Sequence, residues 1–583
     1  MVLRLTGAQA LVRSLRAEQV GHVFGVVGGK LAPLLHAIAQ EPALRYTGVR
    51  HEAHGPLMAA AVHAGSGQVA VALGEMGPGG LNLAAGVGTA FANNLPLLLV
   101  TSNQHRAAAY PHRGMFMDLD TQAVMKPLVK WNAVVHDARR MPELVRRAFR
   151  EALSGRPGPV HLDVPQDVLA DVCDFVSDEF ELSAARYRAA GRTRPSRADV
   201  AAAAALLRGA RRPLIVAGGG VVASGADTLL RRLATRLGAP VLPSQMALGV
   251  VAHDSPFFIG HGGLIGGDAV QAAFERADVV LAVGCRFSSW MWDDQGPLVR
   301  RHQQLININV DPQALGQPAL HTVAMQADAR LALEDLLEAS QTPTDAAVDA
   351  DWLPGLRALR RAYEQKLAAL AEDRGAVMHP AALAQAIAKA LPAQSLVVYD
   401  GGHTTFWSND FTPVAAVRTR FHDPGMSQLG FGLPYAIALQ LLYPDQPVIN
   451  ITGDGAFGFT LQELDTARRL KLPVINIIHN NAAWGIIRAG QRGQLGFELG
   501  TSLAETDYAA IARGFGCHGE TVDAPGDLAA ALDRATASGL PAVIDCHTRF
   551  EPHPCMAAFG RMNRYGFDRP SRDASRSSRP ETP

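Results

Sequence analysis

The 583-residue sequence predicts an α/β fold made of three doubly wound domains, each built on a parallel sheet. Short apolar segments alternate with alanine-rich segments of helical length, which is the pattern of strands joined by crossover helices. The chain is also too long for a single hydrophobic core, since domains usually hold about 150 residues. In addition, residues 448–481 contain a complete strand–helix–strand unit with polar side chains at the end of each strand.

The first predicted domain spans residues 1–176. Thr6 can cap an amphipathic helix that continues to about Glu18, and the segment HVFGVVGG then predicts a strand that enters a glycine turn. The charged and mixed stretch Ser177–Arg197 is typical of a linker. Further strands of the first domain are expected at Val69–Leu73, Pro96–Val100 and Val160–Pro165.

The second predicted domain spans residues 190–340. Its strand pattern begins at Pro213–Gly220 and ends near Leu305–Pro312. The glycine run Gly218–Gly220 could cradle a phosphate, but it lacks the GxGxxG spacing and a well-placed acidic partner. A tight structural turn is therefore the better interpretation.

The third predicted domain spans residues 375–560. A linker at Gln341–Asp351 and a helical segment to about Glu372 precede it, and its strands include LVVYD, VINIT, VINII and PAVIDCHT. The tail, residues 561–583, is rich in Ser, Arg and Pro, so we expect it to be partly disordered. The aromatic, methionine and arginine side chains around its start could form a lid or dock on a neighbouring subunit.

The strand–helix–strand unit of the third domain places two oxygen ligands at neighbouring strand ends. Asp454 follows the first strand and Asn481 the second, and the carboxyl ends of parallel strands face the same crevice. Carboxylate, amide and backbone oxygens suit Mg²⁺ together with a diphosphate. Gly453 and Gly455 allow the backbone to approach a phosphate closely.

Composition argues against several other classes of function. Lys plus Arg equals Asp plus Glu at 54 each, so no overall charge attracts nucleic acid or an anionic membrane. The five cysteines are scattered without a CxxC pair, and no run of about 18 apolar residues occurs. We therefore expect a cytoplasmic protein whose partners are small molecules and copies of itself.

The sequence GDG, followed by 24 residues and then NN, resembles the signature of thiamine-diphosphate enzymes in the acetolactate synthase and pyruvate decarboxylase superfamily. The resemblance implies a pyrimidine-binding, a middle and a diphosphate-binding domain, in that order. It also implies that Mg²⁺ is held by Asp454, Asn481 and the carbonyl of Ala483. The residues that it places around thiamine diphosphate are Gly28, Gly29, Gly77, Pro78, Asn82, Leu429, Gly453, Asp454, Gly455, Ala456, Phe457, Asn481, Trp484 and Gly485.

The same resemblance assigns the residues that activate the cofactor. In RHE, Glu52 matches the family glutamate that hydrogen-bonds the aminopyrimidine ring and so promotes loss of the thiazolium proton. In GMSQLGFGLP, Leu429 takes the place of the apolar residue that bends the cofactor, and Gly425 and Met426 are expected to line the same crevice.

Several positions depart from the family pattern and bear on the substrate. Glu75 stands in GEMGPGGLN where relatives often have Thr or His, so it either faces the substrate as an acid or turns to solvent. An apolar substrate face is expected from Phe116 and Met117, with His112 in the same loop. The substrate-pocket residues that this comparison predicts are Glu75, His112, Phe116, Met117, Met426, Ile486 and Ile487.

The activity implied by the resemblance is decarboxylation of a 2-keto acid and addition of the remaining unit to a second carbonyl compound, as in acetolactate synthases. An alternative is a 2-hydroxyacyl-CoA lyase that releases formyl-CoA and an aldehyde or ketone. A non-catalytic paralogue is disfavoured because Glu52 and the metal ligands are all present. The middle domain could hold FAD or the ADP part of CoA, and a homodimer or homotetramer is expected, with active sites at the subunit interface.

Overall fold

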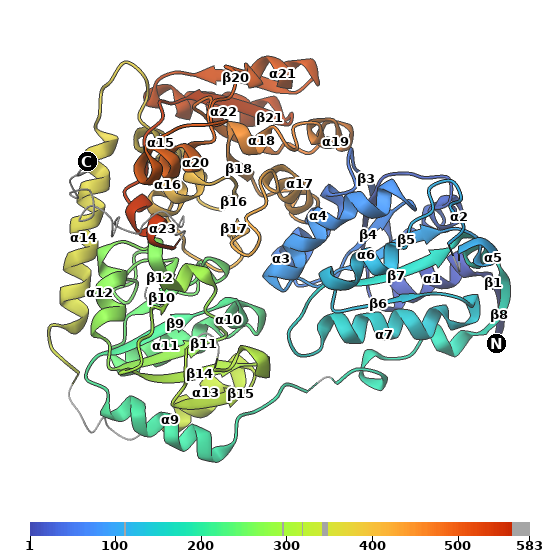
Figure 1. The fold of residues 1–583 in the computed structure, drawn as a ribbon, viewed down its shortest axis with the longest axis horizontal. Coiled ribbons are helices and arrows are strands. Elements are labelled where there is room, and N and C mark those ends of the chain that lie inside the picture. Colours follow the sequence, from blue (N-terminus) through green and yellow to red (C-terminus); the bar gives the residue numbers. More distant parts are fainter. Residues whose placement is uncertain (110–111, 190, 294–295, 317–318, 341–347, 563–583) are drawn as a thin grey trace, which may run out of the picture.

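The computed structural model describes the whole chain except residues 110–111, 190, 294–295, 317–318, 341–347 and 563–583. Three parallel sheets flanked by helices form three domains, as predicted (Figure 1). The N-terminal domain is blue to cyan, the middle domain is largely green, and the C-terminal domain is orange to red. Part of the predicted linker at 341–351 lies outside the described residues.

The N-terminal sheet has six parallel strands in the order β3-β2-β4-β5-β7-β6. These are β2 (His22–Gly25), β3 (Arg45–Gly48), β4 (Val71–Gly74), β5 (Leu98–Asn103), β6 (Trp131–Val134) and β7 (Val160–Pro165). The helices are α1 (Gly7–Ala17), α2 (Ala32–Ala39), α3 (His54–Ser66), α4 (Pro78–Asn93), α5 (Arg106–Ala109), α6 (Thr121–Met125), α7 (Met141–Leu153) and α8 (Gln166–Ala170). The predicted helix cap is confirmed, because the Thr6 hydroxyl accepts from the Gln9 N–H at 3.1 Å. Outside this sheet, β1 (Val2–Thr6) pairs antiparallel with β8 (Val172–Val176).

The C-terminal sheet repeats this strand order as β17-β16-β18-β19-β21-β20. Its strands are β16 (Leu396–Tyr399), β17 (Arg420–His422), β18 (Val448–Gly453), β19 (Ile475–Asn480), β20 (His518–Val522) and β21 (Ala542–His547). Its helices are α15 (Pro380–Ala390), α16 (His403–Phe411), α17 (Gly432–Leu442), α18 (Asp454–Phe457), α19 (Glu463–Leu470), α20 (Gly485–Gly490), α21 (Tyr508–Gly514), α22 (Leu528–Ser538) and α23 (Met556–Met562). In both sheets the order reverses beside the first strand, and this reversal creates a crevice at the carboxyl ends.

The middle sheet has five parallel strands in the order β10-β9-β11-β14-β15. The strands are β9 (Pro213–Ala217), β10 (Val241–Pro243), β11 (Val279–Val283), β14 (Gln304–Asn309) and β15 (Val323–Gln326), and β12 (Trp292–Asp293) and β13 (Gly296–Pro297) form a separate antiparallel pair. The helices are α9 (Arg197–Gly209), α10 (Gly219–Ala223), α11 (Asp227–Leu237), α12 (Asp268–Arg276) and α13 (Ala329–Ala339). The expected end of the pattern near Leu305–Pro312 was wrong, because β15 and α13 follow it. A four-residue edge strand is too short to show a clear period in the sequence.

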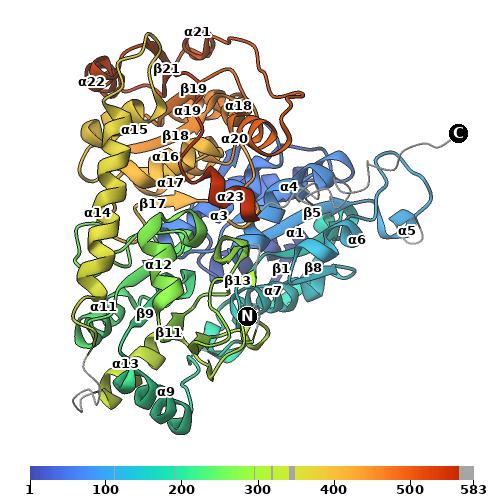
Figure 2. The same ribbon diagram turned by 60° about the vertical axis from the view of Figure 1, so that its left-hand side comes forward.

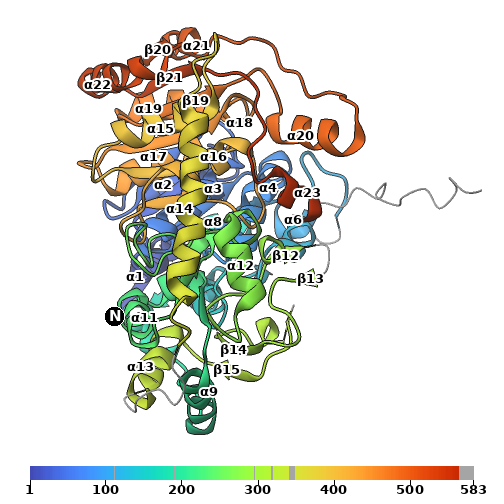
Figure 3. The ribbon, with the colours of Figure 1, turned by 90° about the vertical axis from the view of Figure 1, so that its left-hand side faces the viewer.

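The predicted helix before the third domain is confirmed as α14 (Trp352–Ala371). It runs along the outside of the molecule and contacts α12 of the middle domain and α15 of the C-terminal domain (Figure 3). Helix α14 therefore connects the middle and C-terminal domains, in addition to their direct contacts.

Helices α3 and α17 join the N-terminal and C-terminal domains. Their apolar side chains form one continuous core, and the Tyr443 hydroxyl beyond α17 donates to the Gly65 carbonyl of α3 at 3.0 Å. A Cβ at Gly65 would lie 2.9 Å from a Leu439 methyl group, so the helices approach closely there. The loops that precede α3 and α17 contain Glu52 and Leu429, respectively.

The start of the predicted C-terminal tail is ordered. Arg561 and Met562 complete helix α23, which lies below α20 in Figure 2 and contacts both α20 and the middle-domain strand β12. The tail was expected to dock on a neighbouring subunit or to form a lid, and this first part packs on its own chain. The remaining residues, 563–583, lie outside the described residues.

None of the helices in the described part of the chain combines the length and the apolar character that crossing a bilayer requires.

Candidate functional site

Asp454 begins α18 directly after β18, and its carboxylate is buried. Burial raises the pKa of Asp454 to about 6, while hydrogen bonds from backbone N–H groups of Gly455 and residues 481–483 oppose this rise. One of these bonds is 3.2 Å long, from the Ala483 N–H to Oδ2. A buried carboxylate without a cationic side chain is costly to ionise, so this position favours a bound cation.

Two consecutive asparagines after β19 have different surroundings. The Asn480 amide is used within the fold, since it donates to Asp545 Oδ1 at 3.0 Å and to the Thr506 carbonyl at 3.1 Å. In contrast, Asn481 Oδ1 is buried and has no hydrogen-bond partner. A buried amide oxygen without a donor is a ready ligand for a metal ion.

The turn after Asn481 brings the Ala483 backbone close to the Asp454 carboxylate. Ala482 adopts a left-handed conformation with φ of 50°, and Ala483 bridges Ser502 across the turn. Asp454, Asn481 and the Ala483 carbonyl therefore fit a hard cation of the Mg²⁺ type. Among the described residues there is no cluster of three His, Cys, Asp or Glu side chains that could bind a metal instead.

The neighbouring strand β16 supplies residues that the sequence analysis missed. Gly401 has φ of 92°, and a Cβ at Gly402 would lie 2.7 Å from Ile486. His403 begins α16, is more than nine-tenths buried, and has both ring nitrogens unpartnered. Burial lowers the pKa of His403 to about 3, so its ring is neutral near pH 7. The glycine pair directly after the strand LVVYD was the available signal, because β16 and β18 flank the crevice.

Trp484 packs against the backbone of this crevice. A Cβ at Gly455 would lie 2.5 Å from the Trp484 ring, so only glycine permits this contact. Ala456 and Phe457 of α18 are buried beneath it, and Gly485 begins α20 beside His403. Glycine at these positions lets the backbone pack closely at the crevice, as the close approach of a backbone to a diphosphate requires.

The loop that carries Leu429 is held by a buried carboxylate. Asp400 accepts hydrogen bonds from the N–H groups of Gly430 and Gly432, both at 3.1 Å, and from the Thr452 hydroxyl at 3.3 Å. Gly430 has φ of 86° and no room for a Cβ. Leu429 is half-buried at this fixed turn, whereas Met426 is exposed.

Glu52 lies at the crevice of the N-terminal sheet, in the loop after β3. It is half-buried, and the Asn82 amide of α4 donates to its Oε2 at 3.0 Å. A Cβ at Gly79 would lie 3.4 Å from Glu52 Oε1 and 3.2 Å from the Glu75 Cβ, so Glu52 and Glu75 flank the same turn. Gly77 has φ of 65° and packs on the Met117 backbone, and Pro78 begins α4.

Glu75 turns inward rather than to solvent. Its carboxylate accepts hydrogen bonds from the Lys30 N–H at 2.8 Å, the Met76 N–H at 3.0 Å and the Ser102 hydroxyl at 2.6 Å. A Cβ at Gly28 would lie 2.1 Å from Glu75 Oε2. Glu75 therefore fixes the Gly28–Lys30 turn, while exposed Gly29 lies at its tip.

The other predicted substrate residues lie on two surfaces. In the N-terminal domain, exposed His112 contacts Asp118 at 2.5 Å, and Phe116 is 81% exposed. In the C-terminal domain, Ile486 packs against Gly402, whereas Ile487 is 48% exposed. The structure does not bring these surfaces together around one described cavity.

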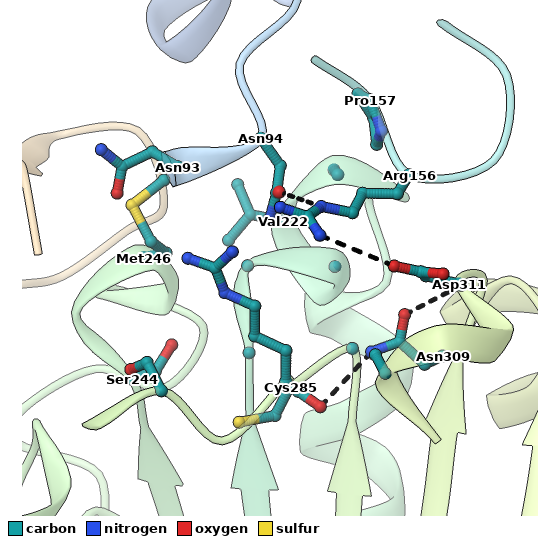
Figure 4. Close-up of a pocket in the computed structure, with 18 of the residues that line it drawn as sticks. Asn93, Asn94, Arg156, Pro157, Val222, Ser244, Met246, Cys285, Asn309 and Asp311 are labelled. Carbon is teal, nitrogen blue, oxygen red and sulfur yellow. Dashed lines mark hydrogen bonds and ion pairs between the residues drawn. The ribbon is translucent and has the colours of Figure 1, made fainter. Parts of the chain in front are cut away.

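A cavity of about 1310 Å³ lies where the three domains meet (Figure 4). At its floor the turns after β9 and β11 meet so closely that a Cβ at Gly218 would lie 2.1 Å from the Gly284 carbonyl. The glycine run Gly218–Gly220 is therefore needed for a tight turn, in agreement with its sequence interpretation. The volume is large enough for a nucleotide or dinucleotide.

Polar groups from two domains line this cavity. Arg156 of the N-terminal domain bonds Asn94 at 2.5 Å and lies 3.8 Å from Asp311, and the Asn309 amide holds the Cys285 carbonyl at 3.3 Å (Figure 4). The buried Arg286 guanidinium donates to the Ala92 carbonyl, and burial lowers its pKa. The two arginine side chains suit a phosphate. The Asp311 carboxylate beside them suits a ribose hydroxyl.

Comparison with known proteins gives consistent matches along the chain. Residues 5–124, 200–336 and 400–546 match the N-terminal TPP binding domain, the central domain and the C-terminal TPP binding domain of thiamine pyrophosphate enzymes. A probable acetolactate synthase large subunit from Methanocaldococcus jannaschii is 29% identical over 559 residues, which cover 93% of this chain and 91% of that protein. The probable 2-ketoarginine decarboxylase AruI from Pseudomonas aeruginosa is 34% identical over 528 residues, 90% of each chain. Acetolactate synthase isozyme 2 large subunit from Escherichia coli is 28% identical over 549 residues, 93% of this chain and 95% of that protein.

We predict that Glu75→Ala will loosen the Gly28–Lys30 turn, because the Lys30 N–H and the Ser102 hydroxyl lose their acceptor, whereas the Met76 N–H keeps its bond to Ser102 Oγ at 3.0 Å. Each donor left unpaired costs about 1–3 kcal/mol where it is buried. Hydrogen exchange followed by mass spectrometry should show faster exchange at the Lys30 amide. Glu143→Ala, which removes an exposed carboxylate on α7, is the control, and equal protection in both variants would contradict the assigned role.

Proposed function

Because this chain belongs to the family of thiamine pyrophosphate enzymes, we propose that it binds thiamine diphosphate with Mg²⁺, decarboxylates a 2-keto acid and joins the remaining unit to a second carbonyl compound. One observation carries the proposal: the buried Asp454 carboxylate faces the same crevice as the unpartnered Asn481 oxygen. The matching crevice of the N-terminal sheet presents Glu52.

The C-terminal domain holds the charged end of the cofactor in this proposal. Asp454, Asn481 and the Ala483 carbonyl bind Mg²⁺, and the glycine turns after β16 and β18 receive the diphosphate. Bound thiamine diphosphate supplies an electron sink for breaking or making a bond beside a carbonyl. Leu429, held in place through Asp400, supports the bent form of the cofactor.

Glu52 acts on the aminopyrimidine end of the cofactor. Its carboxyl group would share a proton with the ring nitrogen of the bound cofactor, and the Asn82 amide orients this carboxyl group by the bond to Oε2. The half-buried loop limits water around this proton.

The complete site is proposed to form between two copies of the chain, as a homodimer or within a homotetramer. Large apolar side chains are exposed on both domains that carry site residues. In the N-terminal domain they include Val27 and Phe116, which are 68% and 81% exposed, and in the C-terminal domain Leu499 is 77% exposed. A contact between two copies of the chain would remove these apolar side chains from water. The second copy would cover them and bring Glu52 to the cofactor of its partner.

The substrate is proposed to be a 2-keto acid whose side chain meets an apolar face. Met426, Ile486 and Ile487 contribute this face from one copy, and Phe116 and Met117 contribute it from the other. A relative that is 34% identical is named for decarboxylation of a 2-keto acid, which supports the first step proposed here.

The alternative activity, a 2-hydroxyacyl-CoA lyase, would place the ADP part of CoA in the cavity between the domains. Its volume of about 1310 Å³ suits the ADP part of CoA, but FAD would also fit. We therefore propose that this cavity holds an adenine nucleotide, and its identity distinguishes the two activities.

Glu52→Gln tests the activity directly. We expect the variant to bind thiamine diphosphate normally but to lose about 10²–10⁴-fold in turnover, since the amide cannot exchange the proton. The assay supplies the cofactor, Mg²⁺ and either a 2-keto acid or a 2-hydroxyacyl-CoA, and it follows CO₂ and formyl-CoA together. Glu143→Gln should match the wild type, and wild-type turnover in Glu52→Gln would exclude the assigned role.

Asp454→Ala tests the metal site. We expect the variant to lose Mg²⁺-dependent retention of thiamine diphosphate, because the charged ligand is removed. Calorimetric titration and the fluorescence of Trp484, which packs on Gly455, measure this binding. Asp533→Ala, at an exposed position of α22, should bind normally, and retained Mg²⁺ dependence in Asp454→Ala would remove the metal assignment.

The nucleotide released from the purified protein tests the cavity. We expect denaturation to release FAD if the protein is a carboligase, or a ligand that contains the ADP part of CoA if it is a lyase. Absorbance and mass spectrometry distinguish the two. Arg286→Ala should reduce the amount released. A wild-type protein that neither releases nor binds either nucleotide would contradict the proposal for this cavity.

A further inference from the structure

A buried carboxylate of the C-terminal domain holds the loop that carries Glu52. Glu463, the first residue of α19, is fully buried. Its Oε1 accepts a hydrogen bond from the Arg50 N–H at 2.8 Å and contacts His54 Nδ1 at 2.6 Å. Its Oε2 accepts from the Thr466 hydroxyl at 2.6 Å. A single side chain therefore binds the N-terminal domain on both sides of Glu52.

A second residue of the same helix reinforces this contact. The Arg469 guanidinium donates to the Gly48 carbonyl, at the end of β3, at 2.7 Å. The His54 ring, with its side chain 5% exposed, begins α3 and packs 5.4 Å from the His51 ring. Helix α19 thus contacts the N-terminal domain at three points: Gly48 at the end of β3, Arg50 before Glu52 and His54 after it.

The burial of the Glu463 carboxyl group restricts the position of the loop that it binds. A buried carboxylate is tolerated only when it is fully hydrogen-bonded, and removal of one partner leaves the others unsatisfied. All of the donors to Glu463 are themselves fixed, because they are a backbone N–H, a buried imidazole and a hydroxyl one turn along the helix. The position of the 50–54 loop is consequently set by the C-terminal domain of the same chain.

We propose that Glu463 is a positioning residue for Glu52, with His54 as its anchor in the N-terminal domain. The inference rests on the proposed function, since it assigns a role in cofactor activation. Glu463 holds the backbone on both sides of Glu52, so that the carboxyl group meets both Asn82 and the aminopyrimidine ring.

The proposal also connects two active sites. Glu463 lies nine residues after Asp454, in the helix that follows the metal turn. In the proposed dimer, Glu52 serves the cofactor of the partner, whereas Asp454 binds the cofactor of its own chain. Helix α19 then joins the metal turn of one site to the catalytic carboxyl group of the other.

The test measures proton exchange at the thiazolium C2 atom of bound thiamine diphosphate. The holoenzyme is diluted into D₂O, quenched in acid and read by NMR, for wild type, Glu463→Gln and His54→Ala. We expect exchange to slow by about tenfold to a hundredfold in Glu463→Gln, with an unchanged cofactor dissociation constant, because a misplaced catalytic group loses rate rather than binding. His54→Ala removes one of the two anchors and should lie between this variant and the wild type.

Two further variants separate positioning from stability. Glu143→Gln changes an exposed carboxylate of α7 that pairs with Arg140 at 2.9 Å, outside the contacts of Glu463 and Arg469, and it should exchange as the wild type does. His54→Gln keeps an N–H donor for Glu463 and should recover part of the rate lost in His54→Ala. If Glu463→Gln fails to fold, the comparison of His54→Ala with His54→Gln tests the proposal in its place.

The outcomes distinguish this inference from the function on which it rests. A wild-type rate of C2 exchange in folded Glu463→Gln, or in His54→Ala with only a lower Tm, would overturn the positioning role alone. If the wild-type protein does not accelerate exchange above that of free thiamine diphosphate, the proposed function fails and the inference fails with it.

Discussion

The close packing of α3 against α17 is the contact on which the arrangement of the site residues depends. The N-terminal and C-terminal sheets have the same strand order, so the helix after the second strand occupies the same place in each domain. These two helices share one apolar core, and Gly65 permits their close approach. Because Glu52 and Leu429 immediately precede these helices, the packing that joins the domains also sets the positions of both loops.

Buried and half-buried carboxylates then fix the individual turns, and their partners distinguish their roles. Asp400 and Glu75 each accept hydrogen bonds from two backbone N–H groups and a hydroxyl, and Glu463 accepts from one backbone N–H and a hydroxyl and contacts the His54 ring, so all three connect segments of the fold. Asp454 also accepts backbone N–H bonds, but it faces the crevice of an asparagine whose oxygen has no donor. That unsatisfied oxygen distinguishes the surroundings of Asp454 from those of the other three, and it is why we propose the cation site there.

The middle domain contributes in a different way. Its glycine turns after β9 and β11 lie so close to each other that no side chain fits between them. The cavity above these turns is lined by residues of all three domains. Arg156 from the N-terminal domain and Asp311 from the middle domain meet across it. A ligand in this cavity would therefore contact residues from more than one domain and stabilise their arrangement.

Local sequence determined the secondary structure, the fold class and the convergence of Asp454 with Asn481, because apolar periodicity and parallel strand ends follow from short-range geometry. Motif resemblance added Glu52 and Leu429. Only the tertiary structure decided that Glu75 turns inward, that His403 is buried without a partner, and that Glu463 binds His54 across 409 residues of chain. Such contacts have no sequence period, since they depend on how separately formed elements pack. The short edge strand β15 was missed for a related reason, because its place is set by pairing with β14 rather than by its own pattern.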